Sequence, residues 1–166
     1  MADEIVYDVD GYDEVTKALL ALINNYPALG ANERIEFATL GEKSGKAMFP
    51  ISGAIVQTET EDITGHVTQD CLYPFYVIYQ KSGLSEKTKV TAKEWLDNLG
   101  RWLERQPVQI NGQPYQLLNY PELNGDRKII EVERQSPSYL DSVDDNKAEK
   151  WAIYISARYR NDFDKI

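Results

Sequence analysis

The 166-residue chain has one cysteine, one histidine and few basic residues, and each scarcity argues against a class of protein. Cys71 alone forms no intramolecular disulfide, so the sequence points to no oxidising compartment. The formal charge of −9 argues against a nucleic-acid reader, because such proteins hold phosphates with a basic surface. No apolar run approaches the ~20 residues that cross a bilayer, and residues 1–4 are acidic where a secretory signal is basic. We therefore expect a soluble protein made and kept in a cytoplasm.

The single histidine, His66, offers little for catalysis or metal binding. A metal site would need cysteine or carboxylate partners, and Cys71 lies five positions along the same expected strand, so the two side chains should point to opposite faces. A Ser-His-Asp triad would have to use His66, and the sequence has no Gly-x-Ser-x-Gly elbow to expose a serine. We expect no enzyme; a small hydrolase using His66 is the alternative.

The segment Gly41–Ala47 superficially resembles a phosphate-binding loop. Its two glycines are separated by three residues where the motif needs four, and Ala47 stands in place of the hydroxyl that binds magnesium. The following residues also read as a strand, whereas the motif opens a helix. We interpret Gly41–Gly45 as a turn and expect no cofactor and no metal.

The chain is organised around Cys71–Tyr79, nine residues without a charge. The run reads as a strand that is apolar at successive positions, so both of its faces should be covered, by helices or by another subunit. Pro74 has no N–H to donate, so the strand should be bulged or unpaired on one side there, as edge strands are.

Periodicity places two helices and several strands around this run. Asp13–Asn25 is an amphipathic helix, and a second helix should begin at a capping box formed by Thr91 and Glu94 and end near Gln106. Strands are expected at Arg34–Leu40, Met48–Thr58, from about His66 into the uncharged run, at Lys128–Arg134 and at Trp151–Tyr159, with a small hairpin at Asn111–Gly112 and a loop at Ser136–Asn146. The prediction is one α+β domain over residues 1–166, of order α-β-β-β-α-β-hairpin-β-β, with a mostly antiparallel sheet and a loosely held segment 1–10.

Two acidic segments are candidates for partner contact. The first is the expected tip of a long projecting hairpin, Thr58–Asp62, and the second is the loop Tyr139–Asn146, which lacks the glycine and terminal glutamate of a calcium-binding EF-hand. The loop Tyr139–Asn146 is a solvated loop, a cation site or a docking site; an aromatic residue beside charges suits the last. The candidate partner-binding residues are Tyr139, Asp141, Asp144, Asp145, Glu59, Glu61 and Asp62.

Four sequence blocks resemble the minor capsid or tail-terminator proteins encoded by siphophages and prophages of Gram-positive bacteria. The blocks are Met48–Ala54, Cys71–Phe75, Trp95–Leu103 and Trp151–Tyr159. The similarity extends from about residue 13 to the C-terminus and involves structural residues without marking an active site.

The resemblance implies a tail-completion protein of the virion that is assembled in the cytoplasm of the bacterial host. Such a subunit is expected to form a ring with copies of itself, a hexamer in related terminators, to cap the tail tube protein and to meet the head–tail connector. DNA would pass through the lumen without specific binding, in keeping with the acidic charge. A head–tail connector or head-completion protein of the phage neck is the alternative position in the virion.

Overall fold

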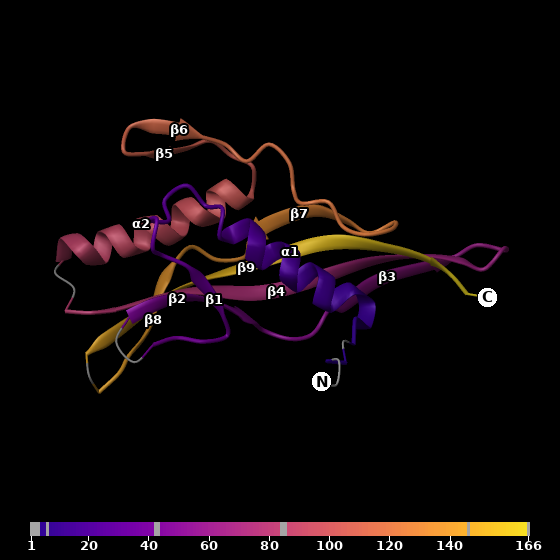
Figure 1. The fold of residues 1–166 in the computed structure, drawn as a ribbon, viewed down its shortest axis with the longest axis horizontal. Coiled ribbons are helices and arrows are strands. Elements are labelled where there is room, and N and C mark those ends of the chain that lie inside the picture. The colour runs from indigo at the N-terminus through magenta and orange to yellow at the C-terminus, as the bar shows by residue number, and fades with distance from the viewer. Residues whose placement is uncertain (1–3, 6, 42–43, 84–85, 146, 166) are drawn as a thin grey trace.

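Two long antiparallel strands form the axis of the molecule. The structure is a computed structural model that describes residues 4–5, 7–41, 44–83, 86–145 and 147–165. β4 (His66–Ser82) and β9 (Ala148–Asp164) have 17 residues each and pair along their whole length (Figure 1). The predicted strands Cys71–Tyr79 and Trp151–Tyr159 are confirmed as the middle portions of these two strands, which extend further at both ends.

Shorter strands flank this pair on both sides. β2 (Ser44–Pro50) and β3 (Ile55–Glu61) pair with successive halves of β4, and β8 (Tyr139–Val143) and β7 (Lys128–Arg134) pair with successive parts of β9. β1 (Ile35–Phe37) adds the single parallel pairing among the described residues, to β2. The predicted α+β class with a mostly antiparallel sheet is confirmed.

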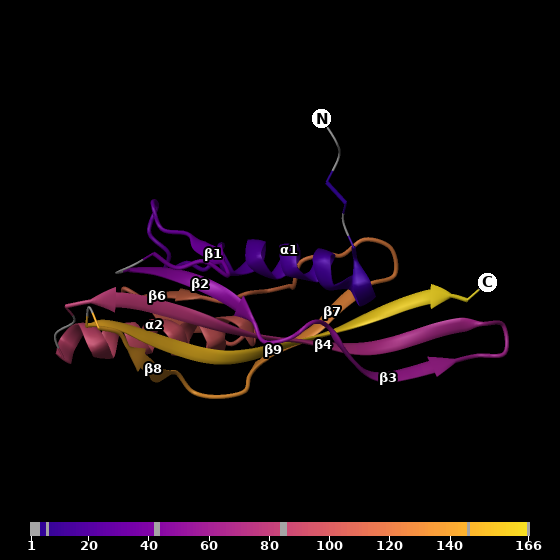
Figure 2. The ribbon, with the colours of Figure 1, turned by 90° about the horizontal axis from the view of Figure 1, so that it is seen from below.

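Both long helices pack on one face of the sheet. A short 3-10 helix, η1 (Val9–Gly11), leads into α1 (Tyr12–Ile23), and α2 is Glu86–Leu103. The ring of Tyr12 on α1 stacks on Tyr73, and Trp95 on α2 meets Tyr79, and both of these tyrosines lie on the same side of β4. One hydrophobic core therefore lies between the helices and this face, and Figure 2 shows α1 lying along it. Among the described residues no helix combines the length and hydropathy that a membrane span requires.

The start of α2 differs from the prediction. The helix already includes Glu86, and Thr91 lies inside it, with its Oγ1 donating to the carbonyl of Lys87 at 3.0 Å. The expected capping box is therefore wrong: in a formed helix the Thr91–Glu94 spacing is simply that of neighbours on one face. The small hairpin is confirmed as β5 (Val108–Ile110) and β6 (Gln113–Tyr115), whose turn residues Asn111 and Gly112 have φ of 51° and 76°, as a tight hairpin turn requires.

Two strand boundaries were predicted wrongly. The expected strand Met48–Thr58 is divided into β2 and β3 by a bend at residues 51–53, and β2 begins at Ser44, inside the expected turn. The expected loop Ser136–Asn146 contains β8, which adds to the edge of β9. Each error involves a strand at the edge of the sheet with many polar residues, β3 or β8, whose pairing depends on a distant partner more than on local pattern. Glu42, Lys43 and Asn146, within these two predicted segments, lie outside the described residues.

Pro74 marks the point where β4 changes neighbours. Pairing with β2 ends at Pro50 opposite Phe75, and pairing with β3 begins at Ile55 opposite Leu72. Between them the Pro74 carbonyl accepts a hydrogen bond from the Ile51 N–H at 3.0 Å. The prediction that β4 is unpaired on one side near Pro74 is confirmed, but β4 is a central strand and the comparison with an edge strand is wrong. A residue without an N–H suits this gap, because no ladder bond is lost.

Candidate functional site

The candidate site lies on the face of the sheet opposite the helices, which we call the open face. The prediction that both faces of the uncharged run would be covered, by helices or by another subunit, is confirmed for the face on which the helices pack, and cover of the second face by another subunit stays a prediction. Tyr73, Phe75 and Val77 point to the helices and are fully buried, whereas Leu72 and Tyr76 point away and are half-buried. Apolar side chains on this second face remain in contact with solvent, and contiguous patches of that kind mark interaction sites.

Three tyrosines from three strands gather on the open face. The rings of Tyr76 on β4 and Tyr154 on β9 lie with centroids 5.4 Å apart. Tyr139 on β8, a predicted partner-binding residue, pairs opposite Ala152 and is 36% exposed. Burial, together with the adjacent Tyr76 hydroxyl, raises the pKa of Tyr139. Half-exposed tyrosines of this kind are frequent at the centres of protein interfaces.

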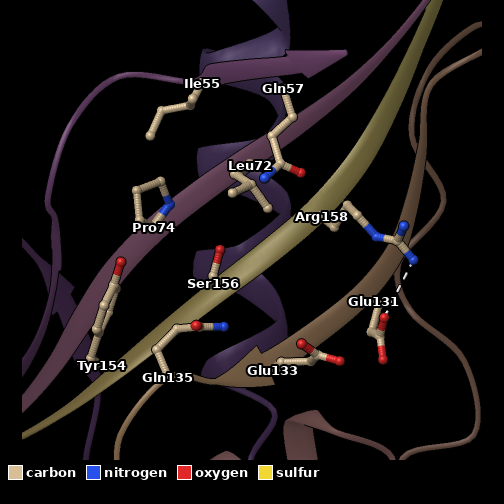
Figure 3. Close-up of a pocket in the computed structure, with 10 residues that line it drawn as sticks. All are labelled: Ile55, Gln57, Leu72, Pro74, Glu131, Glu133, Gln135, Tyr154, Ser156 and Arg158. Atoms are coloured by element: carbon tan, nitrogen blue, oxygen red, sulfur yellow. Dashed lines mark hydrogen bonds and ion pairs between the residues drawn. The ribbon is translucent and has the colours of Figure 1, made fainter.

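A hollow lies beside these tyrosines, where β4 passes from β2 to β3. It has a volume of about 430 Å³ and is lined by side chains of β3, β4, β9 and by residues on and just after β7 (Figure 3). Leu72 and Pro74 form its apolar part, and Glu131 and Arg158 form an ion pair at 3.3 Å on its rim. None of these residues was singled out as a binding residue from the sequence, because each strand contributes only one to three of them.

The two predicted acidic segments lie at opposite ends of the molecule. β3 and the ends of β4 and β9 extend beyond the helices as an arm, which confirms the projecting hairpin (Figures 1 and 2). The turn of this arm is at residues 62–65, slightly later than the predicted tip Thr58–Asp62. The β8–β9 turn lies at the other end, so the seven candidate residues do not form one site.

Several of the predicted acidic residues stabilise the local structure of the arm through hydrogen bonds and ion pairs. Asp62 Oδ1 accepts hydrogen bonds from the Thr64 N–H and hydroxyl and from the His66 N–H, and these bonds lower the pKa of Asp62. Glu59 accepts from Gln69 at 2.7 Å, and Glu61 pairs with Lys165 at 3.1 Å.

At the opposite end, Asp144 Oδ1 accepts the Ala148 N–H at 2.8 Å and so shapes the β8–β9 turn. Asp141 and Asp145 are exposed. The two acidic segments are therefore parts of ordered turns and strands, and Tyr139 alone among the seven candidates is an aromatic residue at the open face.

His66 lies on the arm, between two carboxylates of β9. Its Nδ1 is 2.9 Å from Asp164 and its Nε2 is 3.4 Å from Asp162, and the hydrogen bond with Asp164 raises the pKa of His66. Cys71 is buried on the other face of β4, so the structure does not bring these two residues together. Within the described part of the chain no group of three or more histidine, cysteine and acidic side chains has a geometry suited to a metal ion.

Comparisons with known proteins add no relative. No protein-family model matches the chain, and no similar sequence is found among curated proteins.

Proposed function

We propose that this protein is a tail-completion protein of a bacteriophage: a subunit that forms a ring with its own copies, caps the finished tail tube and joins it to the head connector. The proposal combines the four sequence blocks that resemble tail terminators with one structural observation, the open face. A protein that leaves half-buried tyrosines and the half-buried Leu72 on one side of a central strand has a physical reason to bind another protein there.

Ring formation and capping need more than one contact surface on each subunit. Head-to-tail contacts that close into a ring use two different complementary surfaces. The open face suits contact with a different protein, the tail tube or the connector, and the arm formed by β3 and the ends of β4 and β9 supplies a surface of different chemistry for contact between copies, because its outer part carries Glu59, Glu61, Asp162 and Asp164. The net charge of −9 also suits a ring through which DNA slides, since like charges oppose gripping of phosphates.

The test is capping of polymerising tail tubes. Purified protein added to tail-tube subunits should arrest growth and appear at tube ends by electron microscopy. Tyr154→Glu places a charge on the open face and should abolish capping, whereas Tyr115→Glu, at a 41% exposed tyrosine of β6, is the matched control and should not. Tubes that grow unchanged with the wild-type protein would refute the proposal.

Deletion of the gene distinguishes a tail terminator from a protein of the phage neck. Loss of a terminator is expected to leave overlong or unjoined tails. Loss of a connector or head-completion protein should instead leave full heads that cannot retain DNA or bind normal tails. The second phenotype would assign the protein to the neck.

A further inference from the structure

A row of three side chains crosses the hollow on the open face, and two of its polar groups lack a partner of the kind that the neighbouring row has. In the sheet register Pro74 on β4 lies opposite Ser156 on β9, and Ser156 lies opposite Glu133 on β7. The three side chains are on the same face and line the hollow (Figure 3). The row thus consists of a buried proline ring, a buried hydroxyl and an exposed carboxylate, each about 4.8 Å, one strand spacing, from the next.

The middle member of the row, Ser156, lacks a hydrogen-bond partner. Its residue is only 7% exposed, and among the described residues no atom accepts from or donates to its Oγ. Figure 3 shows the hydroxyl directed among the side chains that line the hollow. A buried polar group left unpaired destabilises a protein, so a ligand that brings a polar atom to this point removes that cost and gains affinity.

The adjacent row shows what the first one is missing. Two residues further along β9, Arg158 lies opposite Leu72 on one side and Glu131 on the other, and its guanidinium pairs with Glu131 at 3.3 Å. In that row the chain supplies its own cation. In the Ser156 row Glu133 forms no ion pair with any described residue, and the hydrogen bond that it shares with Glu131 raises its pKa, the mark of two carboxyl groups held close together.

We propose that this hollow binds an extended segment of a partner protein, which places an apolar side chain on Pro74 and Leu72 and a lysine or arginine, two positions further on, against Glu133. Side chains at i and i+2 of an extended segment share a face and lie roughly 7 Å apart, whereas β4 and β7, two strand spacings apart, are separated by roughly 10 Å. The length of a lysine or arginine side chain covers the difference of roughly 3 Å. A backbone polar group between them meets Ser156. The choice of a protein segment as ligand rests on the proposed assembly function.

The test begins with selection of peptides from a random decapeptide library on the immobilised full-length protein. The expected result is enrichment of an apolar residue followed two positions later by lysine or arginine. Dissociation constants of one enriched peptide are then measured by calorimetry. Glu133→Lys should weaken binding at least about tenfold, since it opposes like charges. Ser156→Ala should weaken binding by roughly twofold to tenfold. Glu94→Lys, an exposed charge reversal on α2, is the matched control and should leave binding unchanged.

Three outcomes would overturn the inference. The first is no enrichment, or enrichment of peptides without a basic residue. The second is equal loss of binding in Glu133→Lys and Glu94→Lys, with unfolding midpoints in urea used to verify that both variants are folded. The third is a wild-type oligomer in sedimentation velocity that Glu133→Lys dissociates, which would make a second copy the occupant. Failure of peptide binding with intact capping of tail tubes refutes this inference alone, whereas peptide binding without capping refutes the proposed function alone.

Discussion

Replacing Leu99 and Leu72 by alanine, one at a time, compares the two faces of the sheet with the same change in side chain. Leu99 on α2 is fully buried in the core, and Leu72 on β4 is half-buried on the open face. Truncating a buried leucine typically costs 2–5 kcal/mol, because the lost transfer energy is joined by a cavity. Full burial of a leucine side chain is worth roughly 1.5–3 kcal/mol. Leu72 has only part of that energy and alanine keeps the share of its Cβ, with no cavity to add because solvent reaches the site, so Leu72→Ala should cost about 1 kcal/mol.

Equilibrium unfolding in urea measures both costs. With a slope of about 2 kcal/mol per molar urea, the midpoint should fall by about 1–2.5 M for Leu99→Ala and by about 0.5 M for Leu72→Ala. Equal effects in dilute protein would refute the one-sided core. Measuring at two protein concentrations provides the control: if the cost of Leu72→Ala grows with concentration, copies of the protein cover the open face, because association stabilises the folded state by mass action.

Three further predictions concern the arm and the packing of the helices. The hydrogen bond with Asp164 raises the pKa of His66. The stabilisation that this pair gives to the C-terminal end of β9 is therefore fully present below the ordinary histidine pKa of ~6.5 and is lost as pH rises through the higher folded-state value. Hydrogen-exchange protection near Asp164 should therefore decline as pH rises above ~6.5 in the wild type but stay flat in His66→Gln, and a flat wild-type profile would contradict this. Gly100→Ala should destabilise by about 1 kcal/mol in urea despite the better helix propensity of alanine, because the new Cβ would overlap Cδ of Arg134 and lie 2.9 Å from Cδ1 of Ile153; a gain in stability would mean that Arg134 moves aside freely. Asn161 donates to the Asp10 carbonyl at 2.8 Å and accepts from Arg127 Nε at 2.9 Å, so Asn161→Leu should cost about 2 kcal/mol and expose η1 to protease, and an unchanged digestion pattern would count against this role.

The elements of this fold with strong periodicity were predictable from the sequence. Asp13–Asn25 and the tryptophan-rich second helix have apolar faces of helical spacing, and the alternation in Trp151–Tyr159 indicated a strand, because these patterns depend on residues close together in the chain. The gap beside Pro74 also follows from local chemistry, since proline lacks the N–H that a continuous ladder would use.

The tertiary structure alone decided which face of the central strand would be open. Cys71–Tyr79 is apolar on both faces, so its sequence is equally compatible with two layers of helices and with one layer and an interface. Both helices pack on the side of Tyr73, an arrangement that depends on long connections and not on local pattern. The row Pro74–Ser156–Glu133 likewise exists only through the register of three strands that are distant in sequence. Residues that meet through strand pairing carry no common signal along the chain, and for this reason the sequence alone pointed to acidic loops, whereas the candidate site lies across the sheet.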